Sequence, residues 1–192
     1  MEREQDSPVY GVNKARLEFL LDGVFAIAMT ILVLELKVPE LSDRRSAGEL
    51  FSQLAHHGRI FFSYLFTFIV LGVLWYKHHV LYRCLRKVTR LMYALHIVLM
   101  AAAAFFPFCA ALLGRYPGNP TTYPVYLGCI WVYVVALWLL WWLAAKQKAL
   151  DPSLEDTQLR RLLARNFKVA IRVTVVFALY VAFFFLRSQP PH

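Results

Sequence analysis

Residues 16–36 read RLEFLLDGVFAIAMTILVLEL, and this run decides the fold class. A helix rises about 1.5 Å per residue and a hydrocarbon core is roughly 30 Å thick, so about 20 apolar residues cross a bilayer. The run is long enough, yet it carries Asp22 and Gly23 near its start and Thr30 in its middle. We therefore predict a membrane-spanning helix that also carries polar, functional side chains.

The rest of the chain has the same apolar character. Of its 192 residues, 59% are hydrophobic and 16% are aromatic, and the mean hydropathy is +0.51, values that soluble domains rarely reach. Further apolar segments lie at 60–76, 91–113, 124–145 and 167–186. We predict an all-α polytopic membrane helix bundle with five transmembrane helices in a single domain, residues 1–192. The opening residues lack the features of a cleaved signal peptide, so the first helix is expected to be retained.

The positions of Lys and Arg predict how the chain is oriented. Most of them lie before the first span, between the second and third, and between the fourth and fifth: Arg3, Lys14, Arg16, Lys77, Arg83, Arg86, Lys87, Arg90, Lys146, Lys148, Arg160, Arg161, Arg165 and Lys168. This bias places the N-terminus in the cytoplasm and the C-terminal SQPPH outside. The net charge of +9 then reflects orientation and contact with membrane lipids, and no nucleic-acid partner is expected.

Three connecting segments stand out between the apolar runs. VPELSDRRSAGE at 38–49 and GRYPGNPTTYP at 114–124 are rich in Pro, Gly and charge, which predicts loops. Residues 146–166 form the predicted cytoplasmic connection. Within it, Ser153 followed by Asp156 and a leucine pattern indicates a short capped amphipathic helix at the membrane surface.

Catalytic and metal-binding motifs are scarce. The cysteines at 84, 109 and 129 are widely separated, and the histidine pairs 56–57 and 78–79 are adjacent, so their side chains diverge on a helix. No nucleotide-binding loop or nucleophile elbow is present. We expect no enzyme, no cofactor and no structural metal.

Ile27, Thr30 and Leu34 lie at i, i+3 and i+7 in the first span, with Gly23 one turn earlier on the same face. A stripe that combines one hydroxyl with branched aliphatic side chains is suited to lining a narrow pore. Small residues and Thr are also common where membrane helices pack together. The spacing leaves both interpretations open.

Asp22 needs a partner or water, because an unpaired carboxylate in a membrane costs at least a few kcal/mol. Arg16 is six residues earlier and reaches it only obliquely or from another subunit. Trp75, His78 and His79 end the second span on the same side and are candidate hydrogen-bond donors. They are equally typical of side chains that anchor a helix at the membrane surface.

These residues resemble a known family. The resemblance rests on Arg16-Leu17-Glu18, the run Asp22-Gly23-Val24-Phe25-Ala26-Ile27-Ala28 with Thr30, Trp75 with His78-His79, and Phe106-Pro107-Phe108 with Ala110 and Leu112. This set is similar to motifs of the transmembrane protein 175 family of endolysosomal and prokaryotic potassium channels. The chain departs from the family in having Leu20-Leu21 where Phe-Ser is usual, and five spans where six are typical.

The resemblance implies a single-repeat prokaryotic type in which a homotetramer surrounds the ion path with its first helices. Ile27 then forms a hydrophobic constriction, Thr30 a hydroxyl layer that K⁺ contacts transiently, and Leu34 a further apolar layer. Arg16, Asp22, Trp75, His78 and His79 form the implied supporting network. The expected function is a potassium-permeable leak channel of the cell membrane. The alternatives are a proton- or ion-coupled secondary transporter and a noncatalytic membrane scaffold.

Overall fold

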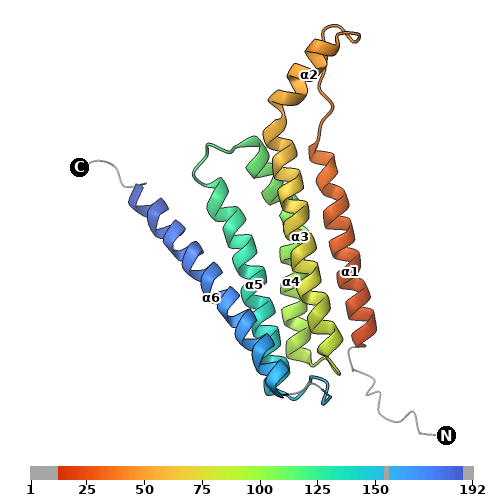
Figure 1. The fold of residues 1–192 in the computed structure, drawn as a ribbon, viewed down its shortest axis with the longest axis vertical. Helices are drawn as coiled ribbons and strands as arrows, with labels where there is room; N and C mark the ends of the chain where they lie inside the picture. Colours follow the sequence, from red (N-terminus) through yellow and green to blue (C-terminus); the bar gives the residue numbers. More distant parts are fainter. Residues whose placement is uncertain (1–12, 154–155, 188–192) are drawn as a thin grey trace, which may run out of the picture.

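The computed structural model describes residues 13–153 and 156–187, and within them it is a helical bundle without strands (Figure 1). The helices, in chain order, are α1 Lys14–Ile31, the 3₁₀ helix η1 Leu32–Glu35, α2 Ala47–His56, α3 Gly58–Cys84, α4 Arg90–Arg115, α5 Thr122–Lys146 and α6 Asp156–Arg187. Five are long and apolar enough to cross a membrane, which confirms the predicted fold. The sequence predictions for residues 1–12 and for SQPPH at 188–192 lie outside the described residues.

Two of the long helices extend well past their apolar segments. The predicted span 60–76 is part of α3, which continues to Cys84. The helical hydrogen bonds of the backbone do not depend on apolar side chains, so the helix can continue where its side chains become polar at the membrane surface. The predicted span 167–186 is the second part of α6, which begins at Asp156. A separate short helix within 146–166 is therefore wrong, since neither Pro nor Gly interrupts the chain between Asp156 and Phe167. The Ser153 cap precedes residues 154–155, which lie outside the described part.

The predicted loop 38–49 is shorter than expected because α2 begins at Ala47. Ser46 caps this helix by accepting a hydrogen bond from the N–H of Glu49 at 3.2 Å. The Glu49 carboxylate in turn accepts from two backbone N–H groups of the loop, those of Ser42 and Asp43, and these bonds lower its pKa. At ten residues, α2 rises about 15 Å and is too short to cross a bilayer.

The helix α4 lies at the centre of the bundle and contacts α1, α3 and α5. The helix α6 packs on α5, on the side of the bundle away from α1 (Figure 1). Aromatic side chains fill much of the core, and the ring of Phe25 in α1 meets the edge of Tyr133 in α5 at 5.9 Å between centroids. This packing fixes which face of α1 is turned into the chain.

Replacing Gly114 with Leu is expected to lower the stability of the bundle by about 1–3 kcal/mol through overpacking. A Cβ at Gly114 would lie 3.2 Å from the Cα of Ile60, so the added side chain meets backbone that cannot move aside. At Gly72 a Cβ meets no heavy atom within 4 Å, so Gly72→Leu is the matched control. The measurement is the unfolding temperature in detergent. Equal temperatures for the two variants would contradict close α3–α4 packing at Gly114.

Candidate functional site

The first helix has two faces with opposite surroundings. The buried face packs against the rest of the chain through Leu17, Leu21, Phe25, Ala28 and Leu32. The opposite face carries the predicted stripe. Ile27 and Thr30 of α1 and Leu34 of η1 are exposed, Ile27 at 59% and Leu34 at 71%. Within the described residues, no helix of the same chain therefore covers this stripe. Lipid or another copy of the chain remains as its neighbour.

The Thr30 hydroxyl bonds back to its own helix. Its oxygen lies 2.9 Å from both the Ala26 and the Ile27 carbonyl oxygens, and it donates its proton to this pair. The lone pairs of the hydroxyl oxygen remain available on the exposed face. Such an oxygen can contact a cation, or accept a hydrogen bond from water, without breaking the helix.

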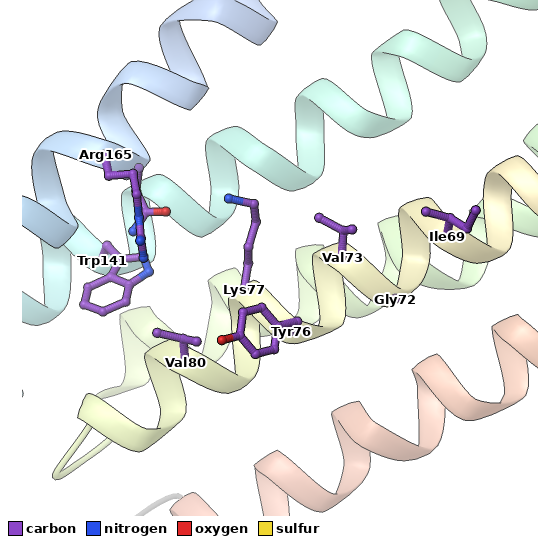
Figure 2. Close-up of a pocket in the computed structure, with 9 residues that line it drawn as sticks. Ile69, Gly72, Val73, Tyr76, Lys77, Val80, Trp141 and Arg165 are labelled. Carbon is purple, nitrogen blue, oxygen red and sulfur yellow. The ribbon is translucent and has the colours of Figure 1, made fainter.

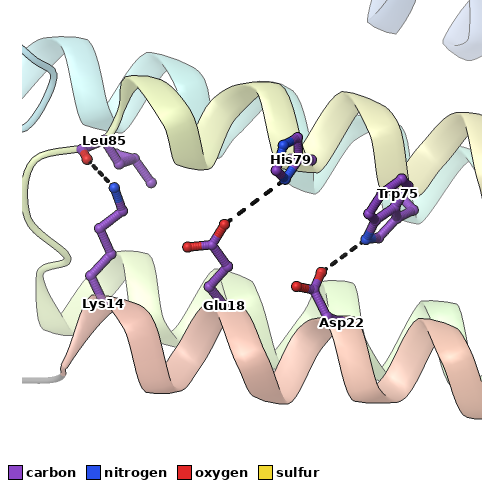
Figure 3. Close-up of polar contacts among 6 residues, drawn as sticks. All are labelled: Lys14, Glu18, Asp22, Trp75, His79 and Leu85. Atoms are coloured by element: carbon purple, nitrogen blue, oxygen red, sulfur yellow. Dashed lines mark hydrogen bonds and ion pairs between the residues drawn. The ribbon is translucent and has the colours of Figure 1, made fainter.

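A series of polar contacts fastens α1 to the end of α3 (Figure 3). Lys14 donates to the Leu85 carbonyl oxygen, Glu18 lies 3.9 Å from Nδ1 of His79, and Trp75 Nε1 donates to Oδ1 of Asp22 at 2.8 Å. The three side chains on α1 are four residues apart, so they stand one above another on one side of the helix. This side is next to the exposed stripe, not part of it.

The structure distributes the predicted supporting residues over different places. Trp75 contacts Asp22, whereas His79 faces Glu18 and stacks on Trp75 at 5.6 Å between ring centroids. Arg16 is exposed and makes no ion pair with any described residue. The contact between Glu18 and His79 was not predicted. The sequence feature that could have indicated this contact is the four-residue spacing from Lys14 through Glu18 to Asp22.

His78 lies inside the bundle and makes no hydrogen bond to Asp22. It is 0% exposed, and its ring packs 4.8 Å from Tyr82 and 5.2 Å from His96, measured between centroids. Within the described residues, neither ring nitrogen of His78 has a hydrogen-bond partner. The adjacent residues 78 and 79 therefore have different environments, because neighbours on a helix point about 100° apart.

The other end of the first helix is also fastened to its own chain. Arg115 at the end of α4 forms an ion pair with Glu35 at the end of η1, with 2.6 Å between Nη2 and Oε2. The stripe from Ile27 to Leu34 thus lies between two anchored residues of the same segment. Asp22 is hydrogen-bonded to α3, and Glu35 is ion-paired with α4. This arrangement holds the exposed face in a defined orientation.

Residues that could hold a metal ion or a redox cofactor are sparse. No group of three or more His, Cys, Asp or Glu side chains comes together in the part of the chain that the structure describes. The three cysteines are free thiols. The chemistry available at the stripe is therefore that of hydroxyl oxygens, apolar side chains and the polar contacts beside them.

Comparisons with known proteins converge on one family. A family model described as "Endosomal/lysosomal potassium channel TMEM175" matches residues 16–107. A potassium channel of Streptomyces collinus is 30% identical over 134 residues, covering 68% of this chain and 64% of that protein. The TMEM175 protein of Gallus gallus, named an endosomal/lysosomal proton channel, is 33% identical over 110 residues, covering 55% of this chain and 22% of that protein. The chain thus spans less than two thirds of each of these relatives.

A solved structure extends the similarity to nearly the whole chain. The crystal structure of a lysosomal potassium-selective channel TMEM175 homolog from Chamaesiphon minutus superposes with a TM-score of 0.74 at 26% identity. The match covers 92% of this chain and 98% of that one. The peripheral helices therefore share the arrangement found in that protein, beyond the region that the family model matches.

Proposed function

This chain belongs to the TMEM175 family, and on that premise we propose that it is a potassium-permeable cation channel. It is a multi-pass membrane protein, and we place it in a cell membrane with its N-terminus in the cytoplasm. A passive channel needs no catalytic residue and no cofactor, and K⁺ is its permeant ion. Its other partners are membrane lipids and further copies of itself.

The exposed stripe on α1 and η1 is the observation that carries this proposal. Ile27, Thr30 and Leu34 face away from their own chain, while both ends of the segment are fastened to it. The described part of one chain encloses no pore at this face, so the ion path requires several copies. In a homotetramer, the α1 helices surround the axis and turn their stripes toward it.

The three layers of the stripe have different roles in this proposal. Ile27 forms a hydrophobic constriction that limits flux by excluding water, and Leu34 forms a further apolar layer. Thr30 supplies hydroxyl oxygens that replace part of the hydration shell of K⁺ as it passes. Hydroxyls replace hydration water only in part, so we expect modest selectivity for potassium over sodium.

The supporting network keeps α1 in register with α3. We assign this role to Asp22 with Trp75, and to His79 with Glu18, on the basis of their contacts. His78 supports the same region by packing inside the bundle. Arg16 is exposed on α1, and we assign it to contacts with another subunit or with lipid headgroups. These are positioning roles, because Trp75, His78 and His79 belong to α3 and are not part of the stripe.

The carrier and the scaffold remain the alternatives to a channel. A proton- or ion-coupled carrier would use Asp22 as a titrating group and show saturable flux. A scaffold would show no flux, with the stripe serving only for packing. Because vertebrate relatives are named proton channels, protons are the second permeant ion that the test includes.

Replacing Thr30 with Ala is expected to lower the ratio of potassium to sodium flux, because the hydroxyl oxygens that substitute for hydration water are lost. The measurement is K⁺, Na⁺ and H⁺ flux from liposomes that contain the purified full chain. Thr174→Ala is the matched control, since that hydroxyl also donates to a carbonyl one turn earlier, Ala170 at 2.8 Å, but lies on α6. A parent protein without cation flux contradicts the channel. An unchanged ratio in Thr30→Ala contradicts only the role of Thr30.

A further inference from the structure

A groove of about 460 Å³ lies between α3, α5 and α6, away from the stripe on α1 (Figure 2). Its lining comes from one side of α3, from Trp141 of α5, and from Arg165 and Asn166 of α6. Since α6 packs mainly on α5, this groove separates α6 from α3. It is one of several hollows on the described surface. Another is also lined by two cations, Arg59 and Arg115, but Arg115 there is paired with Glu35.

Two cations from different helices face this groove. Lys77 of α3 extends its ammonium group into the space beside α5, and the Arg165 guanidinium lies across from it (Figure 2). None of the described lining residues is acidic, and neither cation forms an ion pair with a described carboxylate. Two like charges that share a half-buried space repel each other unless an anion lies between them.

The groove changes from polar to apolar along α3. Lys77 lies about two turns before the end of α3, with Val80 on the side nearer that end. Val73 and Ile69 line the groove one and two turns further from the end (Figure 2). The side chain at position 72 is absent because this residue is Gly, and a Cβ there would meet nothing within 4 Å. The space beside Gly72 is thus open and bordered by aliphatic side chains.

From this arrangement we propose that the groove binds one anionic phospholipid per chain. Its phosphate lies between Lys77 and Arg165, where the Tyr76 hydroxyl and the Asn166 amide line the same groove as further donors. An acyl chain runs along Gly72, Val73 and Ile69. The lipid belongs to the leaflet on the side of the Asp22–Trp75 contact, and it connects α6 to α3. This proposal is independent of ion conduction.

The test measures lipid binding to the detergent-purified full chain by native mass spectrometry. Phosphatidylglycerol is the anionic probe, phosphatidylcholine the zwitterionic probe, and inorganic phosphate the probe without acyl chains. The double variant Lys77→Gln/Arg165→Gln is expected to lose about tenfold or more in affinity for phosphatidylglycerol. The control Arg160→Gln/Arg161→Gln removes the same charge from α6 outside the groove lining and should bind like the parent.

A second variant tests the apolar part of the groove while both cations stay in place. Gly72→Leu fills the open space without meeting the backbone, so it should weaken phosphatidylglycerol binding. Gly58→Leu, where a Cβ also meets nothing within 4 Å, should not. Equal binding of both phospholipids, unchanged binding in the double variant, or phosphate binding as tightly as phosphatidylglycerol would each overturn the proposal. Because no arm measures ion flux, its failure is distinguishable from failure of the proposed channel.

Discussion

Potassium flux is expected to rise about tenfold or more when Ile27 becomes Asn. In the proposed tetramer, the Ile27 side chains form an apolar ring from which water withdraws readily, so a hydrated ion meets a barrier there. Amide side chains at the same positions keep the passage wet. A reduction of the barrier by only about 1.4 kcal/mol is sufficient for a tenfold gain. The measurement is K⁺ flux from liposomes, compared with that of the parent at equal protein density.

The matched control for this variant is Ile171→Asn. It makes the same chemical change at an exposed position, but on α6, which lies on the side of the bundle away from α1. Its flux should equal that of the parent. If Ile27→Asn inserts and assembles normally yet conducts like the parent, Ile27 is not at a constriction and the stripe faces lipid or a subunit interface.

The second large effect is expected for Trp75→Phe, which removes the hydrogen bond to Asp22. Trp75 Nε1 donates to Oδ1 of Asp22 at 2.8 Å, and no other described residue donates to this carboxylate. Phe retains the aromatic ring that stacks on His79 but leaves the carboxylate unpaired, at a cost of about 1–3 kcal/mol. Trp131→Phe is the control, since its lost bond goes to the neutral Thr174 hydroxyl at 3.0 Å. The unfolding temperature in detergent should fall further for Trp75→Phe, and the reverse order would contradict a supporting role.

Asp22→Asn completes this comparison and separates a channel from a carrier. The amide keeps a carbonyl oxygen that can accept from Trp75 Nε1, so the α1–α3 contact persists and passive flux continues. A carrier that protonates Asp22 in each cycle would lose its flux in this variant. Persistent, non-saturating flux in Asp22→Asn therefore supports the channel, and abolished flux in a folded protein supports the carrier.

The membrane fold could be predicted from the sequence because bilayer thickness sets the length of each span. Runs of apolar residues revealed all five long helices, although not their ends. At the end of α3, polar residues continue the helix beyond the apolar segment, and hydropathy does not register this. The start of α6 was missed for the same reason. The helix α2 was missed because its ten residues are too few to form a membrane span and directly follow a loop rich in charge.

The candidate site could be predicted only in part from the sequence. Periodicity placed Ile27, Thr30 and Leu34 on one face, and the family resemblance singled out Trp75 with the two histidines. Neither could distinguish His78 from His79, which occupy a buried cluster and a contact with Glu18, respectively. The groove between Lys77 and Arg165 was also invisible, because these residues are far apart in the chain and meet only through packing.

The sequence by itself determined that this protein has five helices long and apolar enough to cross a membrane, and that Ile27 and Thr30 share a face of α1. Both properties follow from local geometry, since the rise and the period of a helix are the same wherever it forms. The tertiary structure decided which face of α1 is buried, which partner Asp22 has, and that Lys77 and Arg165 face one groove. These depend on how the helices pack, and packing is set by the fit of side chains that are distant in sequence.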